Sequence, residues 1–501
     1  MPYRADDLLD DTDLSFEDRS MKSDSRLGRP LVLVGLVIFT VLVHLAFNLW
    51  YIARTPAFEL HPMTGELLTH EMADLPVRDI ASLTIGSGAD FLRAPLFGVV
   101  EFVSYTLFGF QKSSLVLTVV LINAVLGAVL LYLILLRLLG PSVALIGGIL
   151  NAIYFDSLIF PSLRASYGNF NFVLILGMIY LLLKYMDGWR SWNFWITTLL
   201  VYGVALNMDS KLLLLPVLEL GFLFLFLGSF RKIDFLRMTV CYLGFVVVLS
   251  PFLVRNYVYK GEFRPIQNNS SGAIAAAISK FDNPYIVNVD FPWIHTPEEA
   301  VRMGMIYSDS TEKAIMPVIE DRLAQAFRER PSLFVMNSGY NFIRIVMPWT
   351  LHNTNLKGTF INDPVFEAID ESSLGHTNLS GTSSRLKKYL MREFRMLSSV
   401  ARSGAHFFVK VIVYLLPALL PLLYLMGAGI LLLQRRKSLL LLLMLPVIYH
   451  AGTLTWLLVN PDYLLASYFT YLTLASIAIW SLWNLIRGRR IPVLNPPTLF
   501  S

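Results

Sequence analysis

Long apolar runs alternate with polar segments along this chain, and most of the runs have the length of a membrane-spanning helix. A helix needs about 20 mostly apolar residues to cross roughly 30 Å of hydrocarbon. Such runs occupy residues 31–52, 113–138, 142–161, 169–186, 194–208, 211–228, 236–254, 407–433, 438–459 and 464–486. We therefore predict an all-α polytopic membrane protein with about ten transmembrane helices.

The basic residues indicate an orientation for these helices. If the N-terminus is cytoplasmic, every predicted cytoplasmic turn carries Lys or Arg, as the positive-inside rule requires. These turns contain Arg137, Lys184, Arg190, Arg231, Lys232, Arg237, Arg435, Arg436, Lys437 and Arg487 to Arg490. Counting 331–349 as a further span would put one of the two last clusters outside. That segment also holds Asn337, Asn341 and Arg344, so we interpret it as an interfacial or half-inserted helix.

Two long polar segments then remain on the outer side. The first outer loop covers 53–112, and its end, APLFGVVEFVSYTLFGF, predicts an amphipathic helix lying on the membrane. The second segment is too long for a plain connection and predicts a mixed outer domain. The resulting division is a disordered acidic cytoplasmic tail (1–30), an N-terminal transmembrane module (31–254), an outer, periplasmic domain (255–405), C-terminal transmembrane helices (406–486) and a basic cytoplasmic tail (487–501).

Composition narrows the class of protein. Hydrophobic residues make up 55% of the chain and charged residues 15%, whereas soluble domains carry about 25% charged residues. The net charge of +5 does not indicate a nucleic-acid partner, because the basic residues lie at helix ends. Cys241 is the single cysteine, so an intrachain disulfide is excluded. Compact loops, basic turns and the lack of disulfides favour a bacterial inner membrane.

Polar residues gather in the outer loops and at the outer helix ends. Any one of them could simply mark the end of a helix at the interface. Acids and bases arriving at one face from several loops instead predict a polar cleft for an anionic ligand with a lipid tail. The residues are Glu66, His70, Glu71, Asp74, Arg78, Asp79, Asp90, Arg93, Asp156, Arg164, Asn207, Asp209, Lys211, Arg255, Asn256 and Tyr257.

Five stretches, taken in order, resemble one family. They are DFLRAPLFGVVEFVSYTLFG (90–109), AIYFDSLIFPSLRASYGNFNFVLILGMIYLL (152–182), GVALNMDSKLLLLP (203–216), SPFLVRNYVYKGEFRPIQNN (250–269) and NPDYLLASYFTYLTLASIAI (460–479). Together they are similar to the GT-C superfamily of glycosyltransferases. The nearest branch is the PMT-like one, which contains protein O-mannosyltransferases and lipid A aminoarabinose transferases.

This resemblance implies a GT-C-like fold and an inverting sugar transfer at the outer face. The donor would be a sugar on a polyprenyl phosphate, and the acceptor a lipid, glycan or protein of the cell envelope. An acid of the first loop would act as general base on the acceptor hydroxyl. A cation would stabilise the phosphate as it leaves.

The general base has several candidates. The family shows Asp at the start of a D-x-x-x-Y-x-x-x-A stretch. Aligning on Ala81 brings Asp74 near that position, one residue short and with Arg78 in place of Tyr. Glu66 and Glu71 are the alternatives, followed by Asp79. A missing base would leave an inactive scaffold that still binds the lipid phosphate.

Lys211 is the main candidate for holding the leaving phosphate, supported by Arg255 and Arg164. Pro251 should end the seventh helix at the outer interface and present Arg255 to the cleft. In the alternative interpretation Arg255 only snorkels to anchor the helix end. Arg93, Asn256 and Tyr257 complete the set of donor-binding candidates. No metal site is predicted, although the paired acids of the first loop permit a divalent cation.

A lipid-linked glycan flippase or another transporter is the competing hypothesis. Such a protein should show repeated halves and substrate-facing charges at mid-membrane depth. The helix pattern is not repeated and the polar residues gather on one side, which favours the enzyme. Glu219, inside the sixth run, is unexplained. It either pairs with another buried polar group or lies in the lipid-phosphate groove.

Overall fold

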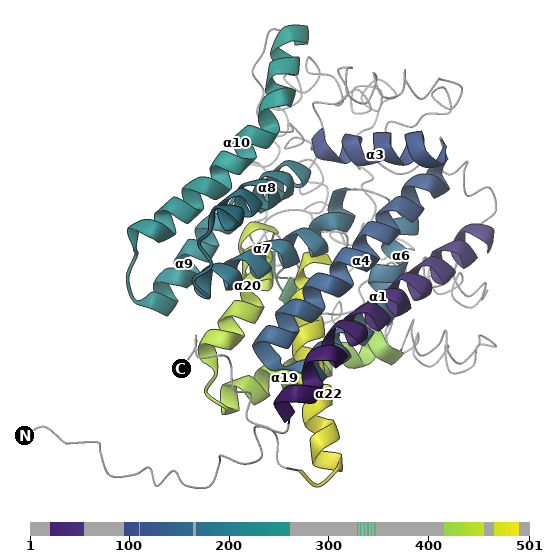
Figure 1. The fold of residues 1–501 in the computed structure, drawn as a ribbon, viewed down its shortest axis with the longest axis vertical. Coiled ribbons are helices and arrows are strands. Elements are labelled where there is room, and N and C mark those ends of the chain that lie inside the picture. Colours follow the sequence, from purple (N-terminus) through teal and green to yellow (C-terminus); the bar gives the residue numbers. More distant parts are fainter. Residues whose placement is uncertain are drawn as a thin grey trace, which may run out of the picture.

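The computed structural model describes residues 21–54, 95–109, 111–163, 167–260, 415–454 and 465–489, together with eight positions between 328 and 346. All regular structure in these residues is helical (Figure 1). The α-helices are α1 (Met21–Arg54), α3 (Pro95–Phe108), α4 (Lys112–Leu139), α5 (Pro141–Ile153), α6 (Phe155–Leu163), α7 (Asn171–Met186), α8 (Trp192–Met208), α9 (Leu215–Leu227), α10 (Lys232–Lys260), α19 (Leu416–Leu433), α20 (Lys437–Leu454) and α22 (Tyr468–Ile486). The short 3-10 helices are η4 (Tyr167–Phe170), η5 (Ser210–Leu212) and η8 (Leu465–Ser467).

Five helical stretches are long and apolar enough to cross a membrane. They are Pro30–Ala53, Lys112–Leu139, Gly168–Met186, Lys232–Val254 and Tyr468–Ile486. The all-helical class is thereby confirmed for the described residues, and the length and apolar composition of these helices support the membrane character. The other apolar helices are shorter, so the total of ten spans stays a prediction. Residues 21–30 of the predicted tail 1–30 belong to α1. Residues 1–20 and most of the outer segment 255–405 lie outside the described residues.

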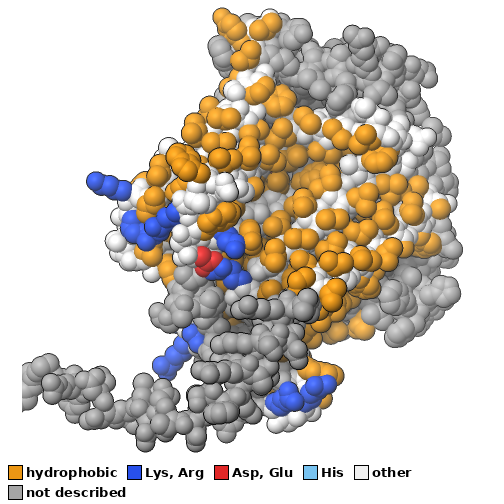
Figure 2. Space-filling model, in the orientation of Figure 1, with side chains coloured by type: hydrophobic (Ala, Val, Ile, Leu, Met, Phe, Trp, Pro, Cys, Tyr) orange, Lys and Arg blue, Asp and Glu red, His pale blue; other side chains and the backbone are white. Residues whose placement is uncertain are grey.

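The surface of the bundle is strongly apolar. Figure 2 shows hydrophobic side chains covering most of the described surface on the visible face, while Lys and Arg side chains gather towards one end. Leu42, Leu225 and Ile486 are each more than 60% exposed. A soluble protein seldom exposes apolar patches larger than a few hundred Å², so this surface suits contact with lipid.

The helix ends define two sides of the bundle. Short connections follow α4, α7, α9 and α19 on one side, which we call the short-turn side. There Arg137, at the end of α4, forms an ion pair with Asp187, just after α7. On the other side α1, α8 and α10 end and α4, α7 and α9 begin (Figure 1). We call it the long-loop side, because the chain leaves α1 and α10 there for its two long polar segments.

Glycines set the spacing of the most closely packed helices. α8 packs along α10, where a Cβ added at Gly244 would overlap the carbonyl oxygen of Leu199. α19 packs along α22 in the same way, with Gly427 against the carbonyl oxygen of Leu474. Such small residues let membrane helices come close enough for their backbones to touch.

Two sequence-based helix boundaries were wrong. The seventh helix does not end at Pro251, because α10 continues to Lys260. Proline removes the N–H that would bond Val247, and the hydroxyl of Ser250 donates to that carbonyl oxygen instead, at 2.7 Å. The run 142–161 is not one helix either. It breaks at Tyr154, whose backbone is extended, and this break separates α5 from α6.

Two outer segments adopt helix as the sequence predicts. The end of the first outer loop forms α3, which packs against α4 and α8. The described positions between 328 and 346 are helical as well. Within them Ile345 is fully buried, and its carbonyl oxygen accepts a hydrogen bond from the hydroxyl of Tyr471 in α22. The placement of both segments at the membrane interface stays a prediction.

Candidate functional site

Lys211 is the sequence-predicted site residue whose surroundings the structure describes most fully. Asp74, Glu66, Glu71, Asp79, Arg93 and Arg164 lie outside the described residues. Arg255 and Asn256 belong to the last turns of α10, but their side chains are outside the described part as well. Tyr257, on the same stretch, is 51% exposed. The meeting of these residues in one cleft stays a prediction.

The turn that carries Lys211 is built around Asp209. This carboxylate is 2% exposed and ends α8 on the long-loop side. Its Oδ1 accepts the backbone N–H of Lys211 at 3.0 Å. Its Oδ2 accepts Nδ2 of Asn171, the first residue of α7, at 2.8 Å. The buried acid thus closes η5 and ties the end of α8 to the start of α7.

α20 holds the same turn from another direction. The hydroxyl of Tyr449 donates to the carbonyl oxygen of Lys211. The same hydroxyl accepts the backbone N–H of Leu214 at 3.2 Å. Two side chains from distant parts of the chain therefore fix the turn, so the backbone position of Lys211 is set by α7, α8 and α20 together.

His450 lies next to this turn. It is buried, and its Nδ1 is 3.3 Å from the hydroxyl oxygen of Ser467 in η8. It is also close enough to Asp209 and Lys211 to interact with both electrostatically. We call Asn171, Asp209, Lys211, Tyr449, His450 and Ser467 the lysine-turn cluster. The cluster combines an ammonium group with imidazole, hydroxyl and amide groups and with the carboxylate of Asp209, and ionisable groups at membrane depth usually face a polar cavity or pair with one another.

Sequence reasoning named Asp209 and Lys211 but missed Tyr449 and His450. Both lie inside an apolar run more than 200 residues away. An ionisable histidine in a predicted membrane helix is itself a signal, because such groups usually face a polar site. Within the described residues no group of three His, Cys, Asp or Glu side chains could hold a metal ion. The acids of the first loop, which permit a divalent cation, are outside that part of the chain.

A small cavity with both polar and apolar side chains in its lining adjoins the lysine-turn cluster. Its polar lining comes from α1, α4, α5, α6, η4 and α22, and its volume is about 30 Å³. The polar lining residues are His44, Asn123, Asn151, Ser157, Asn169 and Tyr468. Asn169 lies two residues before Asn171, and Tyr468 directly follows Ser467. The two polar regions are therefore joined through the same short segments on the long-loop side.

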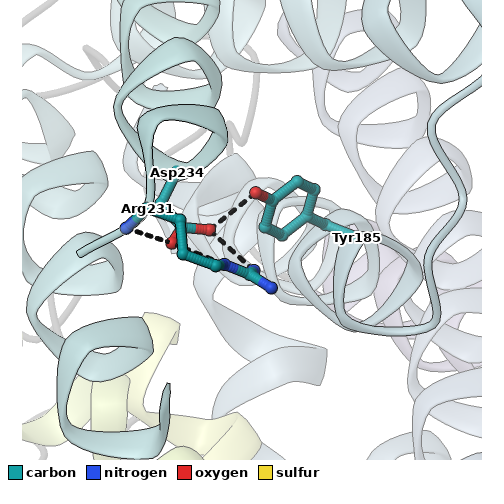
Figure 3. Close-up of polar contacts among 3 residues, drawn as sticks. All are labelled: Tyr185, Arg231 and Asp234. Carbon is teal, nitrogen blue, oxygen red and sulfur yellow. Dashed lines mark hydrogen bonds and ion pairs between the residues drawn. The ribbon is translucent and has the colours of Figure 1, made fainter. Parts of the chain in front are cut away.

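A second polar group lies on the short-turn side (Figure 3). Asp234, near the start of α10, accepts the hydroxyl of Tyr185 at 2.6 Å and Nε and Nη2 of Arg231 at 3.0 and 2.9 Å. The hydrogen bond to Asp234 raises the pKa of Arg231 above its ordinary value. These contacts join the end of α7 to the turn before α10.

Arg237 is a correction to the sequence-based orientation, which assigned it to a cytoplasmic turn. It lies inside α10, is 1% exposed, and its Nη1 is 2.8 Å from Oε2 of Glu219 in α9. The hydroxyl of Tyr202 in α8 donates to Glu219 and accepts from Arg237. A charge can be buried among apolar helices when an opposite charge compensates it. This partner explains Glu219.

Comparisons of this chain with family models, with curated proteins and with solved structures found no match.

Proposed function

We propose that this protein is an integral-membrane glycosyltransferase that moves a sugar from a polyprenyl-phosphate donor to a lipid, glycan or protein of the cell envelope. The observation that carries the proposal is the position of Lys211. Its turn is fixed by Asp209 and Tyr449 on the side where the long polar segments leave the helices. A rigidly placed lysine at that level suits the phosphate of a lipid whose tail lies along the apolar surface.

The reaction uses the residues in distinct roles. An acid of the first loop, Asp74 or in its place Glu66 or Glu71, takes the proton of the acceptor hydroxyl. The acceptor oxygen attacks the anomeric carbon from the face opposite the phosphate, which inverts that centre. The bond from the anomeric carbon to the phosphate oxygen breaks, and the lipid phosphate leaves with the electron pair.

Lys211 holds the phosphate while this charge develops, assisted by Arg164 and Arg255. Preorganised positive charge near a leaving group lowers the barrier because it needs no reorganisation at the moment of reaction. Arg93, Asn256 and Tyr257 complete the donor site. The mechanism requires no cofactor, and a divalent cation at the first-loop acids would reveal itself as inhibition by chelators. The proposed location is a bacterial inner membrane, with both termini cytoplasmic.

Sugar transfer by the purified protein tests this proposal. We would supply radiolabelled sugars on a panel of polyprenyl phosphates, with envelope lipids, glycans and peptides as acceptors. Asp74→Asn and Lys211→Ala should lose at least about 100-fold in rate, as expected when a base or an electrostatic stabiliser is removed. Lys232→Ala is the matched control, because this exposed lysine lies on the short-turn side. If Lys211→Ala transfers sugar as fast as the wild type, its proposed role is wrong.

A transporter of lipid-linked glycans is the second candidate. It is favoured by the ion pair between Glu219 and Arg237, which is buried inside the helices. Ionisable residues within membrane helices often mark transport pathways. Movement of a fluorescent lipid-linked sugar across reconstituted vesicles, lost in Glu219→Gln and without any sugar transfer, would favour the transporter. Donor binding with neither activity would indicate the inactive scaffold.

A further inference from the structure

The cavity beside the lysine-turn cluster contains polar atoms that lack hydrogen-bond partners. His44, in α1, is 3% exposed and neither ring nitrogen has a hydrogen bond. The backbone of Asn151 lies near this ring without forming a hydrogen bond to it. Oδ1 of Asn123, in α4, is likewise buried and unbonded. Buried polar atoms in folded proteins almost always have a partner, so these atoms point to a bound group.

The surrounding contacts hold His44 in this position. Nδ2 of Asn48 donates to the carbonyl oxygen of His44 at 2.8 Å and to that of Leu158 in α6 at 3.0 Å. Oδ1 of Asn48 accepts the hydroxyl of Ser162 at 2.5 Å. α1 is therefore fixed against α6 one turn beyond His44. The fold therefore holds His44 in place at the cavity.

The lining indicates the chemistry of the bound group. The cavity is lined by imidazole, amide and hydroxyl groups together with the apolar side chains of Phe160, Pro161, Phe172 and Leu465. None of these described lining residues is Asp, Glu, Lys or Arg. A cation would lack a carboxylate and an anion would lack a Lys or Arg partner, so both would be costly to bury there. A neutral group that both donates and accepts hydrogen bonds, such as a hydroxyl, suits this lining.

Size limits how much of a ligand can enter. A volume of about 30 Å³ accommodates a water molecule or one hydroxyl group and is too small for a sugar ring. The neighbouring segments show where the cavity lies relative to Lys211. Asn169 and Tyr468 line the cavity, while Asn171 and Ser467, close by in the same segments, belong to the lysine-turn cluster. A ligand whose charged end is held at Lys211 therefore has a neutral pocket next to it.

We propose that this cavity is a specificity subsite, in which His44 and Asn123 bind one hydroxyl group of the donor's sugar and so select a neutral sugar. The inference rests on the proposed function, because it takes the phosphate of the same donor to lie at Lys211. The hydroxyl group displaces water from the cavity and satisfies His44 and Oδ1 of Asn123. An amino sugar bearing a positive charge at this position binds more weakly, because the cavity offers no acid.

Thermal unfolding and binding, measured on the full-length protein in detergent, test the subsite without requiring catalysis. The probes are a short-chain polyprenyl phosphate, the same lipid carrying a neutral hexose, and the same lipid carrying an aminopentose. The neutral-sugar lipid should bind about 3- to 10-fold more tightly than the bare phosphate lipid, which is the effect of one hydrogen bond. In His44→Phe and in Asn123→Leu this advantage should disappear while affinity for the bare phosphate lipid is unchanged.

Thr198→Val is the matched control. Thr198 is buried in α8 with an unbonded hydroxyl, and it does not line the cavity. This variant should keep the full preference for the sugar lipid. Asn123 and His44 belong to different helices. If one of the two variants does not fold, the other still tests the subsite.

The outcomes separate the two proposals. If the bare phosphate lipid binds and the neutral sugar adds nothing, the subsite is wrong while a lipid-phosphate site remains. The subsite is also wrong if both variants keep the preference, or if the aminopentose lipid binds as tightly as the hexose lipid. If none of the three lipids binds to the wild type, the donor site of the proposed function and the subsite are both overturned.

Discussion

Arg237 and Glu219 form an ion pair inside the helix bundle, with Nη1 of Arg237 2.8 Å from Oε2 of Glu219 and both side chains at most 2% exposed. The pair joins α10 to α9, and the hydroxyl of Tyr202 adds α8. If one partner were removed, the other would be left as a buried charge without an opposite charge beside it. The stability of the bundle therefore depends on having either both charges or neither.

Replacing one residue of this pair should therefore lower the free energy of unfolding more than replacing both. Glu219→Leu alone or Arg237→Met alone should lower the free energy of unfolding by about 3–5 kcal/mol, because each leaves an uncompensated buried charge. The double variant should be more stable than either single variant. Unfolding in detergent micelles measures all three. Additive losses in the double variant would show that the two charges do not depend on each other.

On the short-turn side the acid should matter more than its arginine partner. Asp234→Ala removes the acceptor of the buried hydroxyl of Tyr185 and should cost about 1–3 kcal/mol. Arg231→Ala should cost less than about 1 kcal/mol, because the arginine side chain is 41% exposed and its ion pair is screened by water. The same unfolding measurement compares the two variants, and equal losses would contradict this ranking.

The crossing of α8 and α10 should not tolerate a methyl group. In Gly244→Ala the new Cβ overlaps the carbonyl oxygen of Leu199, so the helices must separate at a cost of about 1–3 kcal/mol. Gly221→Ala is the matched control, because a Cβ at Gly221 in α9 meets open space. That variant should be neutral or slightly stabilising, since alanine favours helix. Melting temperatures of the two variants check the prediction.

Activity should depend on the support of Lys211 as well as on the lysine itself. Tyr449→Phe removes the hydrogen bond to the Lys211 carbonyl oxygen and keeps the lysine. Under the proposed function the transfer rate should fall by about 10- to 100-fold, because a small displacement of a reacting or stabilising group is costly. Tyr424→Phe, which loses only a weak contact with the sulfur of Met444, is the control. Equal transfer rates in both variants would show that the hydrogen bond from Tyr449 to the Lys211 turn does not contribute to catalysis.

Helices were predictable from the sequence where their limits depend on local composition. The run 31–52 corresponds to the apolar stretch Pro30–Ala53, and the run 113–138 to Lys112–Leu139. The break at Tyr154 and the passage of α10 through Pro251 were not predictable in the same way. Proline usually ends a helix, and here the hydroxyl of Ser250 offsets the lost hydrogen bond.

Only those residues of the candidate site that lie close together in the sequence were predictable. The polar turn at Asp209 and Lys211 interrupts an apolar region and is visible in the sequence. Tyr449 reaches that turn from 238 positions away, and the partner of Glu219 is likewise on another helix. Such pairings depend on how helices are placed side by side, which a single sequence does not reveal. Arg237 was misassigned for the same reason, since basic residues near helix ends usually mark turns.

The continuation of α10 past Pro251 has a mechanical consequence. Its apolar stretch ends at Val254, and the helix continues for six more residues to Lys260, which extends it by about 9 Å. In Figure 1 this end of α10 rises beyond the neighbouring helices. α10 is thus a rigid helical extension that is anchored by its close crossing with α8. Its length sets how far from the apolar part of the bundle Lys260 lies. A tilt of α10 about its crossing with α8 at Gly244 would displace Lys260, at the far end of the helix, more than it displaces the residues near the crossing.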